Sequence, residues 1–351
     1  MSKRNRVSVL AGLALFCAVA LGAAMPARAA ALNGHESGAA QAIATSESAA
    51  ENAPAPLYSA RGASTCLKCH DSDITEGDRV YRSAMPIFST PHGMKGDLRT
   101  PMGQHQCETC HGPAQAHVES TPAKGQKKTP VPVDFTGSDA APVAVRNQVC
   151  LSCHENGLRM NWKGSLHQKN NIACVSCHTI HVEKDPVLVR ATQPEKCFTC
   201  HTQQRTESFE YSHHPIREGK VVCSDCHNPH GSPGPHLMKE FTVNQVCYTC
   251  HADKRGPMLF EHQPVRENCL NCHTPHGSNE ARLMKERMNF LCSSCHSATG
   301  HYSGGAFGGK GNLPGSLQAT FNSALANNRM CLNCHSQVHG SNSPNGAYFF
   351  R

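Results

Sequence analysis

The stretch CSDCHNPHGS, residues 223–232, recurs almost unchanged as CLNCHTPHGS at residues 269–278. Each copy has two cysteines three positions apart, a histidine directly after the second cysteine, and another histidine three residues later. Residues three and four apart lie on the same face of a helix, so one turn can place both thiols and the adjacent imidazole together. The pattern predicts a short turn that presents these three groups, and it leaves the role of the second histidine open.

The Cys-x-x-Cys-His pattern occurs ten times and uses every cysteine of the chain except Cys17. It is the attachment signature of c-type haem, in which two thiols bond to the porphyrin and the histidine binds iron. The predicted attachment residues are Cys66, Cys69, Cys107, Cys110, Cys150, Cys153, Cys174, Cys177, Cys197, Cys200, Cys223, Cys226, Cys247, Cys250, Cys269, Cys272, Cys292, Cys295, Cys331 and Cys334. The predicted proximal iron ligands are His70, His111, His154, His178, His201, His227, His251, His273, His296 and His335. We therefore predict ten covalently bound haem c groups.

Two other uses of paired cysteines explain the pattern less well. Exported cysteine-rich chains are often disulfide scaffolds, but a scaffold gives no reason for a histidine after every pair. Zinc ribbons need two cysteine pairs for each metal ion and no adjacent histidine. Covalent haem accounts for all three residues of the motif.

Taken in consecutive pairs, the motifs form five repeats with one order: a motif, a spacer containing a histidine, a second motif, and a histidine shortly after it. This order supplies one further histidine for each iron. The predicted distal ligands are His92, His117, His167, His181, His214, His230, His262, His276, His301 and His339. The sequence thus predicts iron with two axial histidines at each site.

The segment YSHHP offers two adjacent candidates, His213 and His214. His214 is preferred because it follows His201 by 13 residues, just as His167 follows His154 by 13. The histidines left over, His105, His213 and His236, are predicted to be ordinary surface residues.

Methionine is the other ligand that the chain offers near His92. Met94 and Met102 are alternatives to that histidine, and methionine ligation would raise the reduction potential. Because a histidine is available in every repeat, imidazole ligation is the expectation there too.

Distance constrains the second histidine of the opening stretch. The two axial ligands approach one iron from opposite faces of the porphyrin. Three residues span at most about 10 Å, too little to pass round the porphyrin rim. His230 is therefore predicted to bind a haem other than the one on Cys223 and Cys226, and the same holds for His181 and His276.

The chain divides into three parts. Residues 1–29 have a basic start, an apolar run over 7–21 and the small-residue site Ala27-Arg28-Ala29, which predicts a secretory signal peptide rather than a retained anchor. Residues 30–60 are rich in Ala, Ser and Glu and are predicted to be a flexible leader. Residues 61–351 are predicted to be one decahaem cytochrome domain of five two-haem units.

The composition is poor for an ordinary aliphatic core. Aromatic residues make up 5% of the chain, and there are 28 glycines and 22 prolines. About 32 residues remain for each predicted haem, so the haems themselves are expected to form the core. The predicted fold class is a multihaem cytochrome c: mostly loops and short α-helices wrapped round a chain of ten haems, elongated, with little or no β-sheet.

The formal net charge of +7 does not predict an acidic partner. Loss of the four basic residues of the signal peptide leaves +3, and the two propionates of each haem would make the loaded protein net negative. Nucleic-acid binding, which depends on positive charge, is therefore not expected. Lysine and arginine are expected to pair with propionates.

The repeat order, together with CHNPHGS, CYTCHADKRGP (247–257) and CLNCHSQVHGSN (331–342), resembles the periplasmic decahaem cytochromes of the MtrA/DmsE type, with PioA and MtoA in the same group. The resemblance runs from about residue 61 to the C-terminus. It implies a periplasmic protein that is associated with the outer membrane through a β-barrel porin. Inside the porin it would link periplasmic electron carriers to extracellular acceptors or donors. It also implies an extracellular partner, either another multihaem cytochrome or a direct contact with mineral or iron.

Two other functions compete with electron transfer across the outer membrane. A free periplasmic electron shuttle or store would need no porin. A multihaem reductase would need an iron with an open axial position, most plausible in the long spacers of the first or fifth repeat. No predicted site lacks a candidate distal histidine, so electron transfer without catalysis is the expectation.

Overall fold

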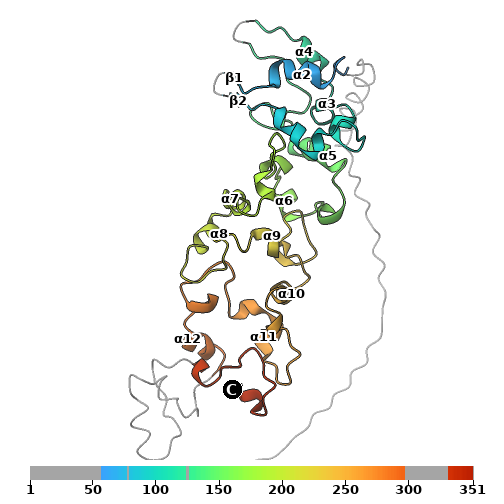
Figure 1. Cartoon of the computed structure of the whole chain (residues 1–351). Coiled ribbons are helices and arrows are strands. Elements are labelled where there is room, and N and C mark those ends of the chain that lie inside the picture. Colours follow the sequence, from blue (N-terminus) through green and yellow to red (C-terminus); the bar gives the residue numbers. More distant parts are fainter. Residues whose placement is uncertain (1–56, 77–78, 124–125, 297–330, 351) are drawn as a thin grey trace, which may run out of the picture. The chain divides into compact units, whose positions relative to one another are not determined.

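The computed structural model describes residues 57–76, 79–123, 126–296 and 331–350. The predicted signal peptide and all but the last four residues of the predicted leader lie outside these ranges. The described chain is a succession of short helices joined by loops (Figure 1).

Regular structure is sparse in the described residues. Eleven α-helices are present, the longest of nine residues, with two strands of three residues each. The helices are α2 (Ala63–His70), α3 (Cys107–His111), α4 (Gln115–Glu119), α5 (Val143–Leu151), α6 (Leu166–Lys169), α7 (Gln193–Phe198), α8 (Thr202–Glu207), α9 (Cys223–Cys226), α10 (Val243–Tyr248), α11 (Gln263–Glu267) and α12 (Met288–Ser293). Strands β1 (Ile74–Glu76) and β2 (Arg79–Tyr81) pair antiparallel, with Ile74 opposite Tyr81. The predicted fold class is confirmed in its loops, short helices and near absence of sheet.

None of the described helices is long and apolar enough to span a bilayer.

Each cysteine motif is a single turn, as predicted from its spacing. The backbone N–H of His154 donates to the carbonyl oxygen of Cys150 at 2.9 Å, and the other motifs from the fourth to the tenth repeat this bond. Motifs three, five, seven and nine terminate helices α5, α7, α10 and α12. Motifs four, eight and ten begin with 3-10 turns at Cys174–Ser176, Cys269–Asn271 and Cys331–Asn333. Both cysteines and the histidine are therefore held within one turn of backbone.

Buried apolar side chains form small separate clusters. One contains Ala63, Ile87 and Met102, packed against Cys107. Another contains Met238, Val243 and Val246, packed against Cys226, Cys247 and Leu270. A domain of this size usually has one contiguous core. Here the described apolar side chains form separate clusters, and motif cysteines pack against each cluster. This arrangement is expected if the porphyrins supply the rest of the apolar interior.

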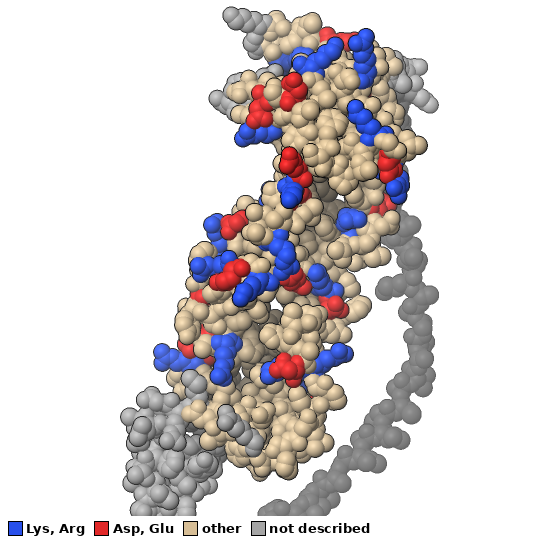
Figure 2. Space-filling model, in the orientation of Figure 1, with Lys and Arg blue, Asp and Glu red and all other residues tan. Residues whose placement is uncertain are grey.

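Charged side chains are dispersed. On the face drawn in Figure 2, lysines and arginines are interspersed with aspartates and glutamates, and uncharged surface separates them. The view shows no large area of a single sign on this face.

Successive repeats interlock through the Gly-Ser that follows the second histidine. Ser278 forms an antiparallel bridge with Ser212, and Ser341 forms one with Phe260. The glycine before each serine allows a close approach: a Cβ on Gly277 would collide with the Glu207 carbonyl oxygen, and one on Gly340 with the Met258 side chain. Each contact joins the end of one repeat to the spacer of the repeat before it.

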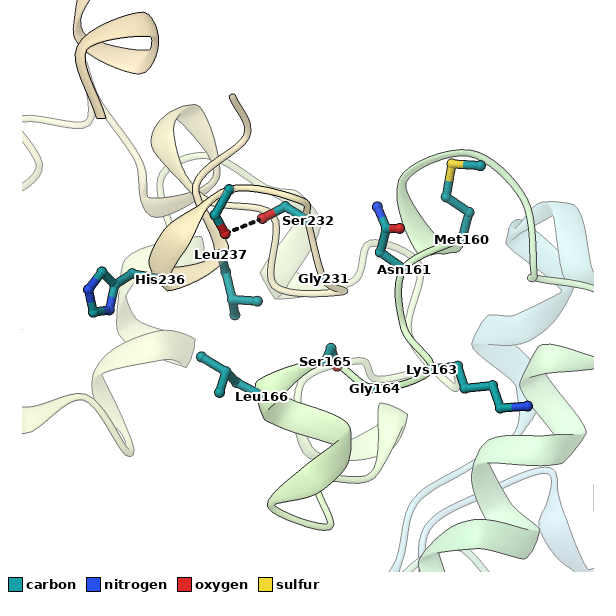
Figure 3. Close-up of a pocket in the computed structure, with 11 residues that line it drawn as sticks. Met160, Asn161, Lys163, Gly164, Ser165, Leu166, Gly231, Ser232, His236 and Leu237 are labelled. Atoms are coloured by element: carbon teal, nitrogen blue, oxygen red, sulfur yellow. Dashed lines mark hydrogen bonds between the residues drawn. The ribbon is translucent and has the colours of Figure 1, made fainter. Parts of the chain in front are cut away.

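The same crossing occurs at the opening stretch. A Cβ on Gly231, which has φ +110°, would collide with the carbonyl oxygen of Asn161, and Asn228 Nδ2 donates to the Leu158 carbonyl oxygen at 2.8 Å. A cavity of about 410 Å³ lies at this crossing, lined by residues 160–161, 163–166, 231–232, 234 and 236–237 (Figure 3). Segments about 70 residues apart in sequence are thus held together beside His167 and His230.

Candidate haem-binding sites

The first cysteines of the two motifs in each predicted repeat are neighbours. Interaction with the Cys107 thiol is the main cause that raises the pKa of Cys66, and the Cys174 thiol does the same to Cys150. The same relationship joins Cys197 to Cys223 and Cys247 to Cys269. Burial is the main cause that raises the pKa of Cys292, and the Cys331 thiol adds to it. Bonded to porphyrin, these sulfurs would not titrate; the interactions report that two attachment sites adjoin within every repeat.

The second cysteines adjoin between repeats. Burial raises the pKa of Cys110, and the thiol of Cys153 adds to the effect. Burial is also the main cause that raises the pKa of Cys177, Cys226 and Cys272. Smaller contributions that raise it come from Cys200 for Cys177, from Cys247 and Cys250 for Cys226, and from Cys295 for Cys272. Attachment sites therefore follow one another without a break through the described motifs.

Nine of the ten predicted proximal histidines face a predicted distal histidine in the described residues. Their ring centroids are 5.8 to 6.5 Å apart. The pairs are His70–His117, His111–His181, His154–His92, His178–His230, His201–His167, His227–His276, His251–His214, His273–His339 and His296–His262. The tenth predicted distal ligand, His301, lies outside the described residues.

This spacing fits one metal ion between two imidazoles. An imidazole nitrogen binds a transition metal at about 2.0–2.1 Å, and the ring centroid lies roughly 1 Å beyond that nitrogen. Two rings on opposite sides of one ion therefore have centroids about 6 Å apart. The donor set and its spacing fit haem iron, with the adjacent cysteines as attachment points.

The repeats exchange histidines in a regular way. His230, of the opening stretch, faces His178 of the preceding repeat at 6.0 Å, and His276 faces His227 in the same manner. In the opposite direction, spacer histidines such as His167 and His214 face the first motif of the following repeat. Only His117 faces a histidine of its own repeat among the described pairs.

Hydrogen bonds orient many of these rings. The Nδ1 atoms of His111 and His227 lie 3.0 and 2.9 Å from the carbonyl oxygens of Val133 and His236. A carbonyl oxygen can only accept, so Nδ1 carries the proton and Nε2 keeps the lone pair that binds a metal ion.

Three distal histidines are oriented by backbone carbonyl oxygens next to another distal histidine. His167 Nδ1 donates to the Pro229 carbonyl oxygen at 2.7 Å, and His214 Nδ1 to the Pro275 carbonyl oxygen at 2.6 Å. His262 Nδ1 donates to the Val338 carbonyl oxygen at 3.0 Å. Each acceptor is the residue directly before a distal histidine of the next repeat. The two histidines that cross between repeats are therefore positioned together.

Two Nδ1 partners in the described part of the chain are carboxylates. Asp185 Oδ2 lies 2.6 Å from His178 Nδ1, and Glu207 Oε2 lies 3.3 Å from His276 Nδ1. By contrast, Nδ1 of His230 is buried without a hydrogen-bond partner. Burial lowers the pKa of His230 to about 4, which keeps this imidazole neutral and able to bind a metal ion.

The structure distinguishes the adjacent histidines His213 and His214 by the residues that they face. His214, not His213, faces His251. His213 is half-buried, with Nδ1 paired to the Glu210 carbonyl oxygen and Nε2 to Glu218. The other two leftover histidines are exposed: His105 stacks on Tyr58 at 4.1 Å, and His236 offers its carbonyl oxygen to His227.

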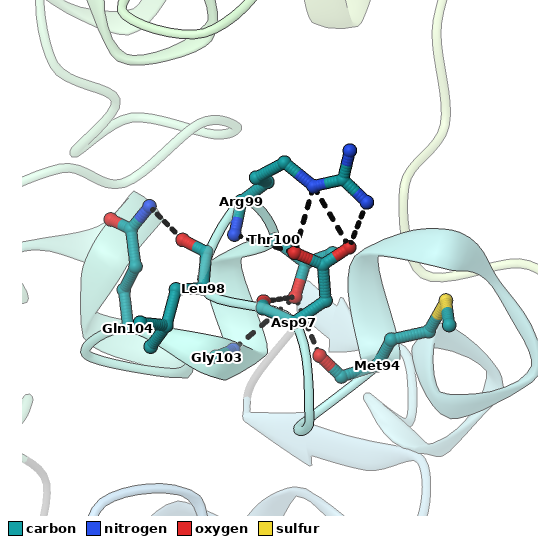
Figure 4. A network of polar contacts seen from close by, with 7 residues as sticks. All are labelled: Met94, Asp97, Leu98, Arg99, Thr100, Gly103 and Gln104. Carbon is teal, nitrogen blue, oxygen red and sulfur yellow. Dashed lines mark hydrogen bonds and ion pairs between the residues drawn. The ribbon is translucent and has the colours of Figure 1, made fainter.

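Neither methionine near His92 takes its place. His92 lies 5.8 Å from His154, whereas Met102 is buried against Ala63 and Ile87. The Met94 side chain is 55% exposed and points away from the loop 94–104 (Figure 4). That loop is held by Thr100, whose hydroxyl donates to the carbonyl oxygens of Met94 and Asp97.

Sequence reasoning missed two buried asparagines that join the motifs of a repeat. Asn147 accepts from the N–H of Cys174 at 2.8 Å and donates to the Ile172 carbonyl oxygen. Asn244 makes the same pair of bonds to Cys269 and Val265. The repeated tetrapeptide NQVC, at 147–150 and 244–247, was the available signal.

Family comparisons agree with this geometry. The doubled CXXCH motif family matches residues 213–256 and 262–301, and the NrfB-like cytochrome c-type protein family matches residues 107–193. The chain is a multihaem c-type cytochrome, an electron-transfer protein rather than an enzyme, and it binds haem covalently.

Individual relatives narrow the class. The chain is 43% identical over 291 residues to the multiheme cytochrome MtrA of Shewanella baltica, which covers 82% of this chain and 81% of that protein. It is 28% identical over 158 residues to the cytochrome c-type protein NrfB of Haemophilus influenzae, and the match covers 41% of this chain and 67% of that protein. The chain belongs to the MtrA family of multihaem cytochromes.

Proposed function

We propose that this chain carries ten haem c groups, each with two axial histidines, and conducts electrons across the outer membrane inside a β-barrel porin. The observation that carries the proposal is the exchange of histidines between repeats, supported by nine facing pairs. Each exchange brings the attachment site of one repeat against that of the next. When bound, the haems supply one-electron exchange between ferric and ferrous iron.

The chain's own residues hold and orient the cofactors. The motif cysteines would attach them, the paired imidazoles would bind the iron from two sides, and the carbonyl oxygens on Nδ1 would fix ring orientation. With both positions filled, no substrate reaches the iron, as electron transfer without catalysis requires.

A porin partner follows from the surface. Propionates and backbone polar groups cannot face lipid without a large desolvation cost. A porphyrin is on the order of 10 Å across, so ten in file can cross a bilayer of about 40–45 Å. We infer a periplasmic protein that enters a protein sheath, takes electrons from or gives them to periplasmic carriers, and meets an extracellular cytochrome, mineral or iron at the other end.

Reconstitution tests the proposal. Liposomes that contain the chain and its porin, with a reducible dye enclosed, should transfer electrons from an external donor. The control is the double variant C174S/C177S, which lacks a haem in the middle of the file and should transfer far more slowly. Retention of wild-type rates by this control, or failure of the chain to associate with a barrel protein, would favour a free periplasmic shuttle.

A further inference from the structure

The two carboxylates on Nδ1 atoms distinguish two sites from their neighbours. Asp185 is the closer: its Oδ2 lies 2.6 Å from His178 Nδ1, and its side chain is 11% exposed. Glu207 lies 3.3 Å from His276 Nδ1 and is more exposed, at 26%. At most other sites where the partner is defined, a backbone carbonyl oxygen occupies this position.

Asp185 is held in place independently of the imidazole. Its Oδ1 accepts from the N–H groups of Thr179 and Val187, at 3.2 and 3.4 Å. The carboxylate therefore caps the 3-10 turn Pro186–Leu188 while its second oxygen meets His178. This double anchoring fixes its position relative to the ring.

A carboxylate changes the ligand more than a carbonyl does. Hydrogen bonds to a charged acceptor are roughly twice as strong as neutral ones. Pulling the Nδ1 proton outward makes the imidazole a stronger donor through Nε2. A stronger donor stabilises ferric iron over ferrous iron, so the one-electron reduction potential falls, while the proton stays between the ring and the carboxylate. His230, on the opposite side of this site, has no partner on Nδ1 to produce a competing effect.

We propose that Asp185 sets the reduction potential of the haem on Cys174, Cys177 and His178 below those of its neighbours, and that Glu207 does the same more weakly for the haem on Cys223 and Cys226. The proposal rests on the axial pairs of the proposed function. Asp185 acts through the imidazole and is a positioning residue. Two low-potential sites would then stand at the fourth and sixth places among the ten.

The test is a potentiometric titration of the full holoprotein and the variant Asp185→Asn. Asparagine retains the turn cap and removes the charge. The area between the two titration curves sums the potential changes of all haems, so a single changed site can be measured among ten. We expect the titration curve of Asp185→Asn to move to higher potential. The area between the curves should correspond to one haem whose ferric-to-ferrous ratio at a fixed potential changes by up to about tenfold, which is about 59 mV. Glu207→Gln should give a smaller displacement.

Asp225→Asn is the matched control. Asp225 lies two residues from His227 but bonds Arg190 and the Val222 N–H, not an imidazole. Asp225→Asn removes the same charge near a haem without changing any imidazole hydrogen bond, so it measures the through-space effect of the charge together with loss of the Arg190 ion pair. Electron paramagnetic resonance supplies the second readout: one low-spin ferric signal should change its g values in Asp185→Asn and none in Asp225→Asn.

The outcomes separate the two proposals. Ten low-spin haems in the wild type with superimposed curves for Asp185→Asn would overturn the role of Asp185 alone, as would an equal displacement in Asp225→Asn. A high-spin iron at this site in the wild type would overturn the axial pairing on which both proposals rest.

Discussion

The imidazoles of His178 and His230 lie 6.0 Å apart with their planes inclined by 9°, although His230 follows a different cysteine motif. The motif just before His230 pairs its own histidine, His227, with His276. The second histidine of the stretch CSDCHNPHGS thus belongs spatially to the preceding repeat. Except for His117, which faces His70 of its own repeat, each distal histidine of the described pairs serves a neighbouring repeat.

Replacing His230 should open one iron, and that iron should be the one on Cys174 and Cys177. His230→Ala is expected to bind one carbon monoxide per reduced chain, because one axial position loses its imidazole, whereas the wild type binds none. His236→Ala is the control, since that side chain is exposed and only its backbone contacts a proximal histidine. Carbon monoxide binding is measured by the Soret difference spectrum.

A triple variant identifies the iron. C174S/C177S/His230→Ala lacks both the haem predicted to be opened and its distal ligand, so carbon monoxide binding should disappear. Continued binding would assign His230 to another haem.

Removing the amide of Asn147 should destabilise the fold. Asn147→Ala leaves the Cys174 N–H and the Ile172 carbonyl oxygen without their partner in a buried position, which costs about 1–3 kcal/mol. The neighbouring Gln148 is exposed, and Gln148→Ala should stay within about 0.5 kcal/mol of wild type. Denaturant unfolding of the holoprotein, followed in the Soret band, compares the two midpoints; equal midpoints would contradict the bridging role.

Gly231 should tolerate no side chain, and Gly219 provides a matched comparison. Both have positive φ, +110° and +68°, so alanine at either carries the left-handed cost of about 1–2 kcal/mol. Only at Gly231 would the new Cβ collide with the Asn161 carbonyl oxygen, while the space beside Gly219 is open. Gly231→Ala should therefore lose about 1–3 kcal/mol more. Thermal unfolding of the two variants measures the difference, and matching losses would argue against a close crossing.

Glu108 should tie the segment 57–60 to the cytochrome domain in a pH-dependent way. Burial raises the pKa of this carboxyl, but the N–H groups of Ala114 and Ser59 outweigh it and hold the pKa below 4.5. Because the folded-state pKa is lowered, the stabilisation is complete above about pH 4.5 and is lost as pH falls through the folded-state value. Proteolysis near residue 58 by an acid-active protease should accelerate over that range.

Two variants test this assignment. Glu108→Gln should be cleaved readily at every pH at which the protease is active, while Glu119→Gln, at an exposed position, should behave as wild type. A wild-type cleavage rate that does not change with pH would contradict the role of Glu108.

The sequence predicted the attachment sites and the grouping into repeats because both depend on local spacing. The choice of His214 followed from an offset shared with His167, which is also local. The pairing of histidines across repeats depends on backbone crossings such as that of Gly277 with Glu207, which no local pattern specifies. The Nδ1 partners escaped prediction for the same reason: a carbonyl oxygen, as at Pro229 and Pro275, has no signature in sequence.

The exchange of histidines also determines the order in which the two histidines of each site become available during export. In a chain that is exported from its N-terminus, spacer histidines such as His167 emerge before the motif they serve, so that site has its second ligand at once. His70, His111, His178, His227 and His273 instead face histidines that lie between 47 and 70 residues further along. Under the proposed coordination, these five irons remain accessible to small molecules until the later chain arrives, so an export arrested midway would leave a reactive haem protein.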